Sequence, residues 1–310
     1  MPKQPDILVI VNPVSGGGRA LRAQPLVAGF FEQRGLRADF VRSQSANDLR
    51  KRAAQGAAAG YPYIIALGGD GAFHHLVEGV FGSDVTLSFL PAGNGNDIAE
   101  ALNIPKDPIA AADVFMKTEA RPMDVLRARF GGGRTALYVG AGGMGLDAEA
   151  AGLANERFRH WPGVTRYLAG ALWALARFPL LEVNATISTD SETEHWKGKI
   201  LLAAVANAPC YGSGFRIAPG ARVDDGLLDI LLAGTMPWAR VVEALPILLR
   251  TGDLRWNEVH RYRATRIRLE ADRPALFHGD GELLGEAPVE VEVLPAAIRV
   301  VAPQPVPRPT

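Results

Sequence analysis

The sequence predicts an α/β domain with a doubly wound, mostly parallel sheet, followed by an all-β, sandwich-like domain. The chain has 310 residues, more than the roughly 250–300 residues at which one hydrophobic core usually divides into two. Up to about residue 121, short β-rich runs alternate with longer helical patterns, whereas the sequence after Pro122 consists mostly of short strands. We therefore expect one domain over residues 1–121 and a second over residues 122–310.

The first domain has the pattern of a βαβ series. We expect strands at 6–11, 37–41, 61–67 and 84–90, three of them almost entirely apolar, as in a parallel sheet that helices cover on both faces. Helices are expected at 18–35 and 45–60, the second capped by Ser45 and ended by Gly60. Ligands of such sheets bind beyond the carboxyl ends of the strands.

The second domain reads as a succession of strands. The expected strands are 123–130, 135–141, 182–189, 197–206, 227–233, 264–271 and 289–295, with helical intervals near 146–178 and 237–250. The long apolar tract Tyr167–Val183 contains Arg177 and Pro179 and is shorter than the roughly 20 residues that span a bilayer. We do not expect it to cross a membrane.

Charge and cysteine content narrow the partners and the compartment. Lys+Arg and Asp+Glu both total 33, so no overall basic field favours nucleic acid. A single cysteine, Cys210, excludes an internal disulfide and suits the reducing cytoplasm. The N-terminus lacks the long apolar segment of a secretory signal. These features predict a cytoplasmic protein, with a peripheral position at the membrane as a second option.

Glycine-rich loops follow three of the predicted parallel strands. They are Asn12–Gly18, Gly68–Gly71 and Pro91–Asp97. Glycine lets the backbone approach a ligand closely, and the helix N-termini that follow add positive dipole, so loops of this kind suit phosphate. Two of the loops contain aspartate, and carboxylates beside phosphate normally require Mg²⁺ between them. The pattern predicts a phosphate and magnesium site at one edge of the sheet.

These motifs resemble those of the diacylglycerol kinase catalytic family, which includes soluble bacterial lipid kinases and the sphingosine and ceramide kinases. Asn12-Pro13 with Ser15-Gly16, Gly68-Gly69-Asp70-Gly71, and Gly93 with Asn96-Asp97 and Ala99 have the order and spacing of that family. Residues 218–234 and 277–300 are similar to its C-terminal signatures. The resemblance implies a NAD kinase-like first domain and a β-sandwich second domain, with the strand near 298–301 returning to the first.

The resemblance also implies a reaction and a set of site residues. ATP and Mg²⁺ would be the cofactors, and a lipid alcohol would be the acceptor. Glu282 is the candidate general base, while Asp70 and Asp97 would hold Mg²⁺ or support the phosphate cradle. The nucleotide-binding residues would be Asn12, Ser15, Gly16, Ser43, Gly68, Gly69, Gly71, Ala72, Gly93, Asn94 and Asn96.

A second metal loop, structural in the family, is implied at residues 222–229. The matching ligands are the carbonyl of Arg222, the carboxylate of Asp225 and the carbonyl of Leu227, and Asp124 is expected to join the metal network. A plain Asp-Gly turn before a strand is an equal alternative for this loop. For Asp124 the alternative is a solvated residue at the start of a strand.

The chain departs from the family pattern inside the predicted phosphate cradle. Ala72 and Asn94 stand where threonine is usual, and His74-His75 replace an Asn-Glu pair. One lost neutral hydrogen bond weakens binding by about 0.5–1.5 kcal/mol. Neighbouring residues in a helix point about 100° apart, so we expect packing or surface roles for the two histidines rather than shared binding of a metal.

A further glycine motif, Gly140–Gly145, fits G-x-G-x-x-G after a predicted strand. A dinucleotide fingerprint also requires an acidic residue ending a strand about 20 positions later, and the sequence there does not provide one. We interpret the motif as a glycine-rich crossing near the nucleotide cleft, and we do not expect hydride chemistry.

Three functions stay open from the sequence. A lipid kinase is favoured, a NAD kinase is the nearest competing enzyme, and a non-catalytic nucleotide- and lipid-binding protein is suggested by the altered loop. The apolar tracts 167–181 and 236–249 are candidates for transient contact with a membrane surface, although such faces are more often core. A homodimer is a further expectation.

Overall fold

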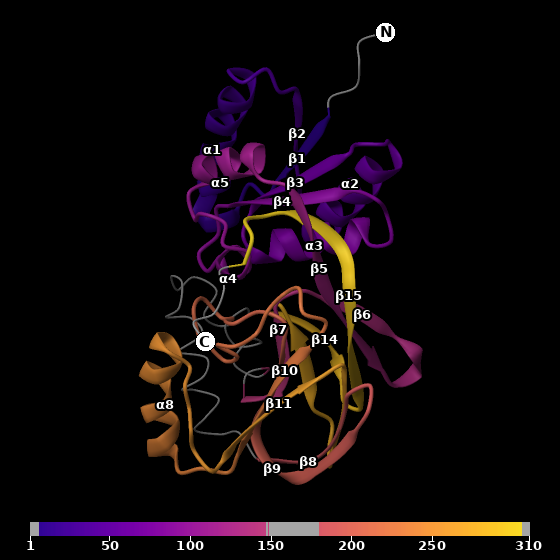
Figure 1. Cartoon of the computed structure of the whole chain (residues 1–310), viewed down its shortest axis with the longest axis vertical. Helices are drawn as coiled ribbons and strands as arrows, with labels where there is room; N and C mark the ends of the chain where they lie inside the picture. Colours follow the sequence, from indigo (N-terminus) through magenta and orange to yellow (C-terminus); the bar gives the residue numbers. More distant parts are fainter. Residues whose placement is uncertain (1–5, 147, 149–179, 306–310) are drawn as a thin grey trace. The chain divides into compact units, whose positions relative to one another are not determined.

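The chain folds into two compact units in a computed structural model that describes residues 6–146, 148 and 180–305 (Figure 1). Unit 1 comprises Met1–Met123 and Ala296–Thr310, and unit 2 comprises Asp124–Pro295. The chain passes between them within strands β5 (Ala120–Phe130) and β15 (Val289–Val301). The division thus falls after Met123, and residues from Ala296 onward belong to unit 1.

Unit 1 is built on a parallel sheet. Its strands are β1 (Ile7–Val11), β2 (Ala38–Arg42), β3 (Tyr63–Gly68) and β4 (Thr86–Pro91), in the order β4-β3-β1-β2. The end of β15 adds a parallel strand, because Arg299 and Val300 pair with Thr86 and Leu87 of β4. Every residue of β1 is buried, as expected for a strand inside a sheet covered on both faces.

The helices of unit 1 connect these strands. They are α1 (Ser15–Glu32), α2 (Ala46–Ala58), α3 (Asp70–Val80), α4 (Asp97–Ala101) and α5 (Pro108–Lys117). Helix α1 packs against α5, and α2 packs against α3. The predicted cap of α2 is confirmed, since the Ser45 hydroxyl oxygen accepts a hydrogen bond from the Asp48 amide at 3.1 Å.

Unit 2 consists mainly of antiparallel strands. Besides β5 and β15, these are β6 (Thr135–Tyr138), β7 (Ala141–Gly145), β8 (Leu181–Ser188), β9 (Thr193–Ala206), β10 (Leu228–Gly234), β11 (Val259–Ala264), β12 (Arg266–Ala271), β13 (Leu276–Gly279) and β14 (Glu282–Glu286). The pairing order is β14-β13-β7-β9-β8-β12-β15; β10 pairs with β9 and β11, and β5 pairs with β6 and β15. Helix α8 (Trp238–Arg250) follows β10, and a short 3₁₀ turn (Gly131–Gly133) joins β5 to β6.

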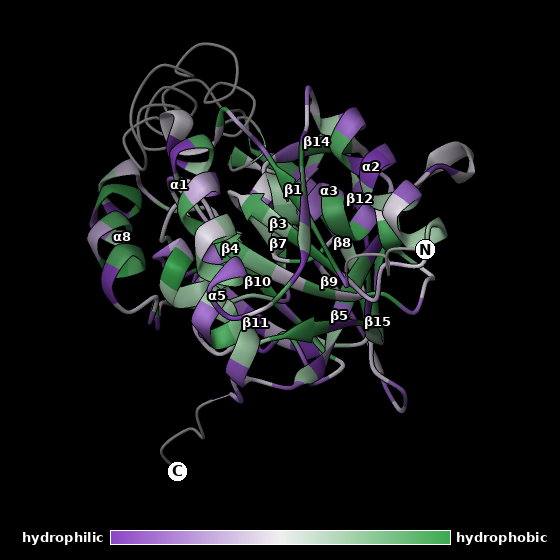
Figure 2. Ribbon diagram, turned by 90° about the horizontal axis from the view of Figure 1, so that it is seen from above, coloured by the Kyte–Doolittle hydropathy of each residue, from purple (hydrophilic) through white to green (hydrophobic). Residues whose placement is uncertain are grey.

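Hydrophobic residues concentrate in the strands, while α1, α5 and α8 carry alternating hydrophobic and hydrophilic bands (Figure 2). In unit 2 the ring of Phe277 lies 6.1 Å from the rings of both Phe130 and Tyr138, at the centre of the core. Among the described residues, no helix is both long and apolar enough to cross a membrane. Most of the tract 167–183 lies outside the described residues, as does nearly all of the helical interval expected at 146–178.

The Gly140–Gly145 motif forms a strand, which corrects its interpretation as a glycine-rich crossing. Ala141–Gly145 is β7, and it lies between β9 and β13. A methyl group on Gly142 would collide with the carbonyl oxygen of His278, and one on Gly145 would lie 2.5 Å from that of Leu201. These glycines therefore permit close approach of neighbouring strands rather than of a ligand.

Candidate functional site

The three glycine loops meet at the carboxyl ends of the parallel strands of unit 1. A methyl group on Gly93 would lie 2.5 Å from the Cα of Gly69, so these two residues are packed backbone against backbone. The Gly69 amide donates a hydrogen bond to the Ser15 hydroxyl oxygen at 3.2 Å, which joins the first loop to the second. A methyl group on Gly16, whose φ is +59°, would collide with the carbonyl oxygen of Ala92 in the third loop. We call this arrangement the three-loop cradle.

Asp70 fixes the third loop of the cradle. Its two carboxylate oxygens accept hydrogen bonds from the amides of Asn96 (2.8 Å) and Ile98 (3.0 Å). Asn96 has a left-handed backbone, with φ of 59°, and its side chain bonds both the amide and the carbonyl of Gly93, at 2.9 and 3.0 Å. Asp97, the first residue of α4, is buried beside this turn. Asp70, Asn96 and Gly93 therefore belong to one polar network, with Asp97 next to it in the chain.

Arg19 supplies positive charge at the cradle, and the sequence analysis missed it. Its guanidinium donates hydrogen bonds to the Gly93 carbonyl and, at 2.8 Å, to the Asn94 side-chain oxygen. Arg19 comes directly after the glycines whose φ values are positive, at the point where the regular part of α1 begins. Its position immediately after Ser15–Gly18 was the available signal, but the helical pattern placed it only within the helix expected at 18–35.

A cavity of about 460 Å³ opens beside Arg19, within the size range of small-molecule sites. Besides Arg19, it is lined by two cationic side chains, one carboxylate and several apolar side chains, a mixture typical of small-molecule sites. Its lining residues are Arg19, Arg22, Ala23, Leu26, Pro91, Ala92, Gly93, Asn96, Lys106, Asp107, Pro108 and Ile109.

The other predicted binding residues lie just after the carboxyl ends of β1, β2 and β3. The Asn12 side-chain oxygen accepts a bond from the Val14 amide at 3.4 Å. Ser43, at the end of β2, is buried and donates from both its amide (2.9 Å) and its hydroxyl (3.3 Å) to the Val11 carbonyl. Ala72 is only 2% exposed and packs against Gly68, whereas a methyl group on Gly71 would meet no atom within 4 Å.

Glu282 lies in unit 2 as the first residue of β14. It follows a tight turn in which Asp280 and Gly281 have φ values of 52° and 84°, the backbone that a two-residue hairpin requires. The Asp280 carboxylate accepts hydrogen bonds from the amides of Val139 and Gly140, both at 2.8 Å. The turn is thus anchored by Asp280, a residue the sequence analysis did not single out, and Glu282 itself is exposed.

Asp124 and Asp225 both accept hydrogen bonds from main-chain amides of the predicted metal loop of unit 2. Asp124 is 2% exposed, and its carboxylate accepts a hydrogen bond from the Gly226 amide at 2.7 Å. This excludes the alternative of a solvated turn residue. One oxygen of Asp225 accepts from the Leu227 amide at 3.2 Å, and the other forms an ion pair with Arg263. Arg222 bonds Asp224 at 3.1 Å.

The geometry of the Asp225 loop gives the plain Asp-Gly turn direct support. Arg263 already provides the positive charge that a cation would bring to Asp225, and carbonyls of Arg222 and Leu227 alone are fewer oxygens than a hard cation needs. The metal ligands expected here stay a prediction.

Comparison with known proteins agrees with the two units. Residues 6–128 match the diacylglycerol kinase catalytic domain, and residues 140–302 match the YegS C-terminal NAD kinase beta sandwich-like domain. A "Diacylglycerol kinase" of Mycobacterium tuberculosis (strain ATCC 25618 / H37Rv) is 29% identical over 303 residues, covering 96% of this chain and 95% of the relative.

A second relative and a solved structure extend the comparison. The "Probable lipid kinase YegS-like" of Pseudomonas aeruginosa (strain ATCC 15692 / PAO1) is 32% identical over 259 residues, covering 83% of this chain and 82% of the relative. A crystal structure of a diacylglycerol kinase from Bacillus anthracis str. Sterne has a TM-score of 0.73 at 20% identity, over 98% of both chains. This last similarity concerns the fold.

The fold and the matched domains define a two-domain protein of the lipid kinase class, and the chain belongs to the diacylglycerol kinase catalytic-domain family, together with YegS-like lipid kinases. The predicted fold class and the resemblance drawn from the sequence are confirmed.

Proposed function

We propose that the chain is an ATP-dependent lipid kinase that transfers the γ-phosphate to the hydroxyl of a diacylglycerol-like or sphingoid lipid. The observation that carries this proposal is the three-loop cradle with Arg19 bonded to its third loop. Phosphoryl transfer asks a protein mainly to position the reactants and to neutralise charge on the phosphates. The cradle and its cations provide the groups for both tasks.

Phosphate binding rests on backbone and cationic groups. Gly69 immediately precedes α3, an 11-residue helix, and the N-terminus of such a helix carries about half a positive charge and orphan amides. Arg19, Arg22 and Lys106 add cationic side chains beside the same loops. The cradle therefore favours an anion although the chain has no net charge.

Asp70 and Asp97 would hold Mg²⁺ in this proposal. The Asp70 carboxylate holds the backbone of the loop around Asn96, and Asp97 is buried beside the same turn. The donor set, carboxylate oxygen close to phosphate, is the type that Mg²⁺ prefers. When bound, the ion would neutralise charge on the phosphate oxygens.

Glu282 is proposed as the general base. The lipid oxygen forms a bond to the γ-phosphorus, the bond from that phosphorus to the bridging oxygen breaks, and ADP leaves with the electron pair. The hydroxyl proton passes to the Glu282 carboxylate. The anchored Asp280-Gly281 turn supports this role, because it presents an exposed carboxylate at a defined position.

Helix α8 is proposed as the contact with the membrane in which the acceptor lipid resides. Trp238, Val242 and Leu249 are 69%, 37% and 40% exposed. At 100° per residue, these three positions fall within about 40° of one another on the helix. Tryptophan with aliphatic neighbours on one helix face suits the boundary between lipid headgroups and acyl chains. Loss of vesicle binding in Trp238→Ser, with the fold retained, would support this contact.

The acceptor separates a lipid kinase from a NAD kinase. Purified protein should be incubated with ATP and Mg²⁺ and with diacylglycerol vesicles, sphingosine vesicles or NAD in parallel. The proposal expects a phosphorylated lipid and no NADP. Formation of NADP without phosphorylated lipid would instead favour the NAD kinase alternative, against which the lipid kinase relatives already count.

A further inference from the structure

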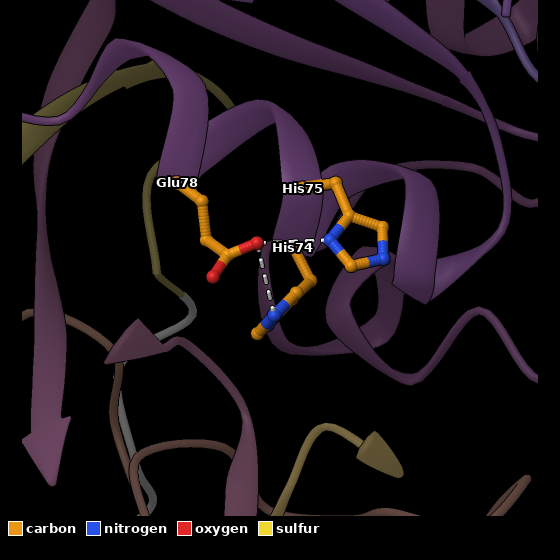
Figure 3. Close-up of side chains that lie close together, drawn as sticks. All are labelled: His74, His75 and Glu78. Atoms are coloured by element: carbon orange, nitrogen blue, oxygen red, sulfur yellow. Dashed lines mark hydrogen bonds and ion pairs between the residues drawn. The ribbon is translucent and has the colours of Figure 1, made fainter. Parts of the chain in front are cut away.

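Three side chains of helix α3 converge at one point. His75 Nδ1 lies 2.9 Å from Glu78 Oε2, and His74 Nε2 lies 3.6 Å from the same oxygen (Figure 3). The two imidazole rings have centroids 4.9 Å apart and meet edge to face. One ligand atom from each of the three residues lies within 4.8 Å of the other two.

This convergence corrects the expectation that the two histidines point apart. Their Cα–Cβ bonds do leave the helix at different angles, but Glu78 lies three residues after His75 and four after His74. Residues at those spacings are neighbours on a helix surface. Both rings therefore turn toward a common carboxylate one turn further along α3, as Figure 3 shows.

The two separations from Glu78 are close to those between ligands of a tetrahedral transition-metal ion. Zn–N and Zn–O bonds of about 2.0–2.2 Å at tetrahedral angles put two ligand atoms about 3.3–3.5 Å apart. The observed separations from Glu78 of 2.9 and 3.6 Å lie on either side of that value. Two imidazoles with one carboxylate form a ligand set that binds Zn²⁺ and leaves a fourth position for water.

The surroundings suit an ion that can still enter from solvent. The His74 side chain is 2% exposed, whereas His75 and Glu78 are 16% and 20% exposed. A glutamate carboxyl is ordinarily ionised near neutral pH, which is the form that binds a metal.

We propose that His74, His75 and Glu78 form a binding site for a divalent transition-metal ion, Zn²⁺ in the first instance. The site is separate from the Mg²⁺ proposed at the cradle, because imidazole ligands favour zinc and related ions over magnesium. The ion would link the second and third turns of α3. That helix begins at Asp70, whose carboxylate holds the third loop of the cradle, so metal binding would stiffen the helix on which the loop depends.

The test uses the untagged, full-length protein stripped of metal, with Co²⁺ and Zn²⁺ as probes and neither ATP nor lipid present. We expect one Co²⁺ per chain with the visible absorption of tetrahedral cobalt, displacement by Zn²⁺, and a higher midpoint of thermal unfolding with Zn²⁺ bound. His75→Ala and Glu78→Gln change partly exposed ligands, so the fold should survive. Each should weaken binding by more than about tenfold, since even residues behind the ligands are worth 10–100-fold.

His195→Ala is the matched control, because His195 is an exposed histidine of β9, outside the cluster. This variant should bind Co²⁺ like the wild type. Absence of tight binding to the wild type, or wild-type affinity in both His75→Ala and Glu78→Gln, would overturn the proposal. Since no nucleotide or lipid is used, failure here leaves the proposed kinase activity to its own test.

Discussion

Gly93 and Gly69 lie so close that a methyl group on Gly93 would come within 2.5 Å of the Gly69 Cα. The neighbour is main chain, so it cannot move aside as the end of a flexible side chain could. Gly93→Ala must therefore separate the second and third loops of the cradle, at a cost of about 1–3 kcal/mol for overpacking. We expect ATP affinity, measured by calorimetry, to fall at least about tenfold.

Gly29→Ala provides the matched control for that substitution. Gly29 lies within α1, and a methyl group there would meet no atom within 4 Å. This variant should bind ATP normally and be as stable as the wild type or slightly more so. Wild-type ATP affinity in Gly93→Ala would show that contact between the loops does not shape the nucleotide site.

Arg19→Gln tests the cation at the cradle. The substitution removes the positive charge and the bonds to Gly93 and Asn94, and bonds to charged groups contribute about 1.5–3 kcal/mol. ATP affinity should fall by about 10- to 100-fold. Arg34→Gln is the control, because Arg34 follows the far end of α1, stacks on Phe30 and should leave ATP binding unchanged. If Arg19→Gln and Arg34→Gln bind ATP equally well, Arg22 or Lys106 would be the better candidate for the phosphate-binding cation.

Glu282→Gln tests the general base. The amide keeps the shape of the side chain but cannot accept the hydroxyl proton, so kcat should fall by about 10²- to 10⁴-fold while ATP binding is nearly unchanged. Glu286→Gln, on the same strand and also exposed, should retain wild-type kcat. A Glu282→Gln variant with more than about a tenth of the activity would make Asp70 or Asp97 the better candidate.

The lowered pKa of Glu292 predicts how the stability of unit 2 depends on pH. Burial would raise the pKa of Glu292, but the bond from Arg127 at 2.7 Å and the charges of Arg127, Arg129 and Arg266 outweigh it and hold the pKa below its ordinary 4.5. A carboxyl with a lowered folded-state pKa stabilises the fold above its unfolded value, and this contribution is lost as pH falls through the folded value.

Glu292→Gln should therefore be less stable than the wild type at pH 7, by about 1–3 kcal/mol, because three partly exposed arginines lose their common partner. The difference should shrink as the pH falls below about 4.5. Urea unfolding at both pH values measures it, with Glu270→Gln as an exposed control. A destabilisation that is the same at acidic and neutral pH would contradict the role given to the Glu292 charge.

The parallel sheet and the cradle could be predicted because simple rules connect them to the sequence. Apolar runs at βαβ spacing give parallel strands, and the ends of such strands meet at one edge, so the loops after β1, β3 and β4 had to converge. Strand β11 was missed because its sequence, VHRYRA, has no clear apolar alternation. The strand over Ala141–Gly145 was missed because glycine is depleted in strands, so a run of glycines gives no strand pattern.

The directions of side chains were harder to predict than the path of the backbone. The bonds from Arg19 to Gly93 and Asn94 join residues 74 and 75 positions apart, and periodicity says nothing about such contacts. The His74–Glu78 cluster depends on side-chain torsions that bring two rings to one carboxylate. The reason for an alanine at position 72 is visible only in the structure. Ala72 is almost fully buried against Gly68, and a larger side chain would need extra room.

A single-turnover experiment tests the central claim, that this chain moves phosphate from ATP to a lipid alcohol. Protein in excess over γ-labelled ATP is mixed with Mg²⁺ and vesicles that contain diacylglycerol or a sphingoid alcohol, and the label in the extracted lipid is followed with time. We predict transfer of the label to lipid in the wild type and its near absence in Glu282→Gln. Tight ATP binding with no labelled lipid for any acceptor would contradict the claim and identify a non-catalytic nucleotide-binding protein.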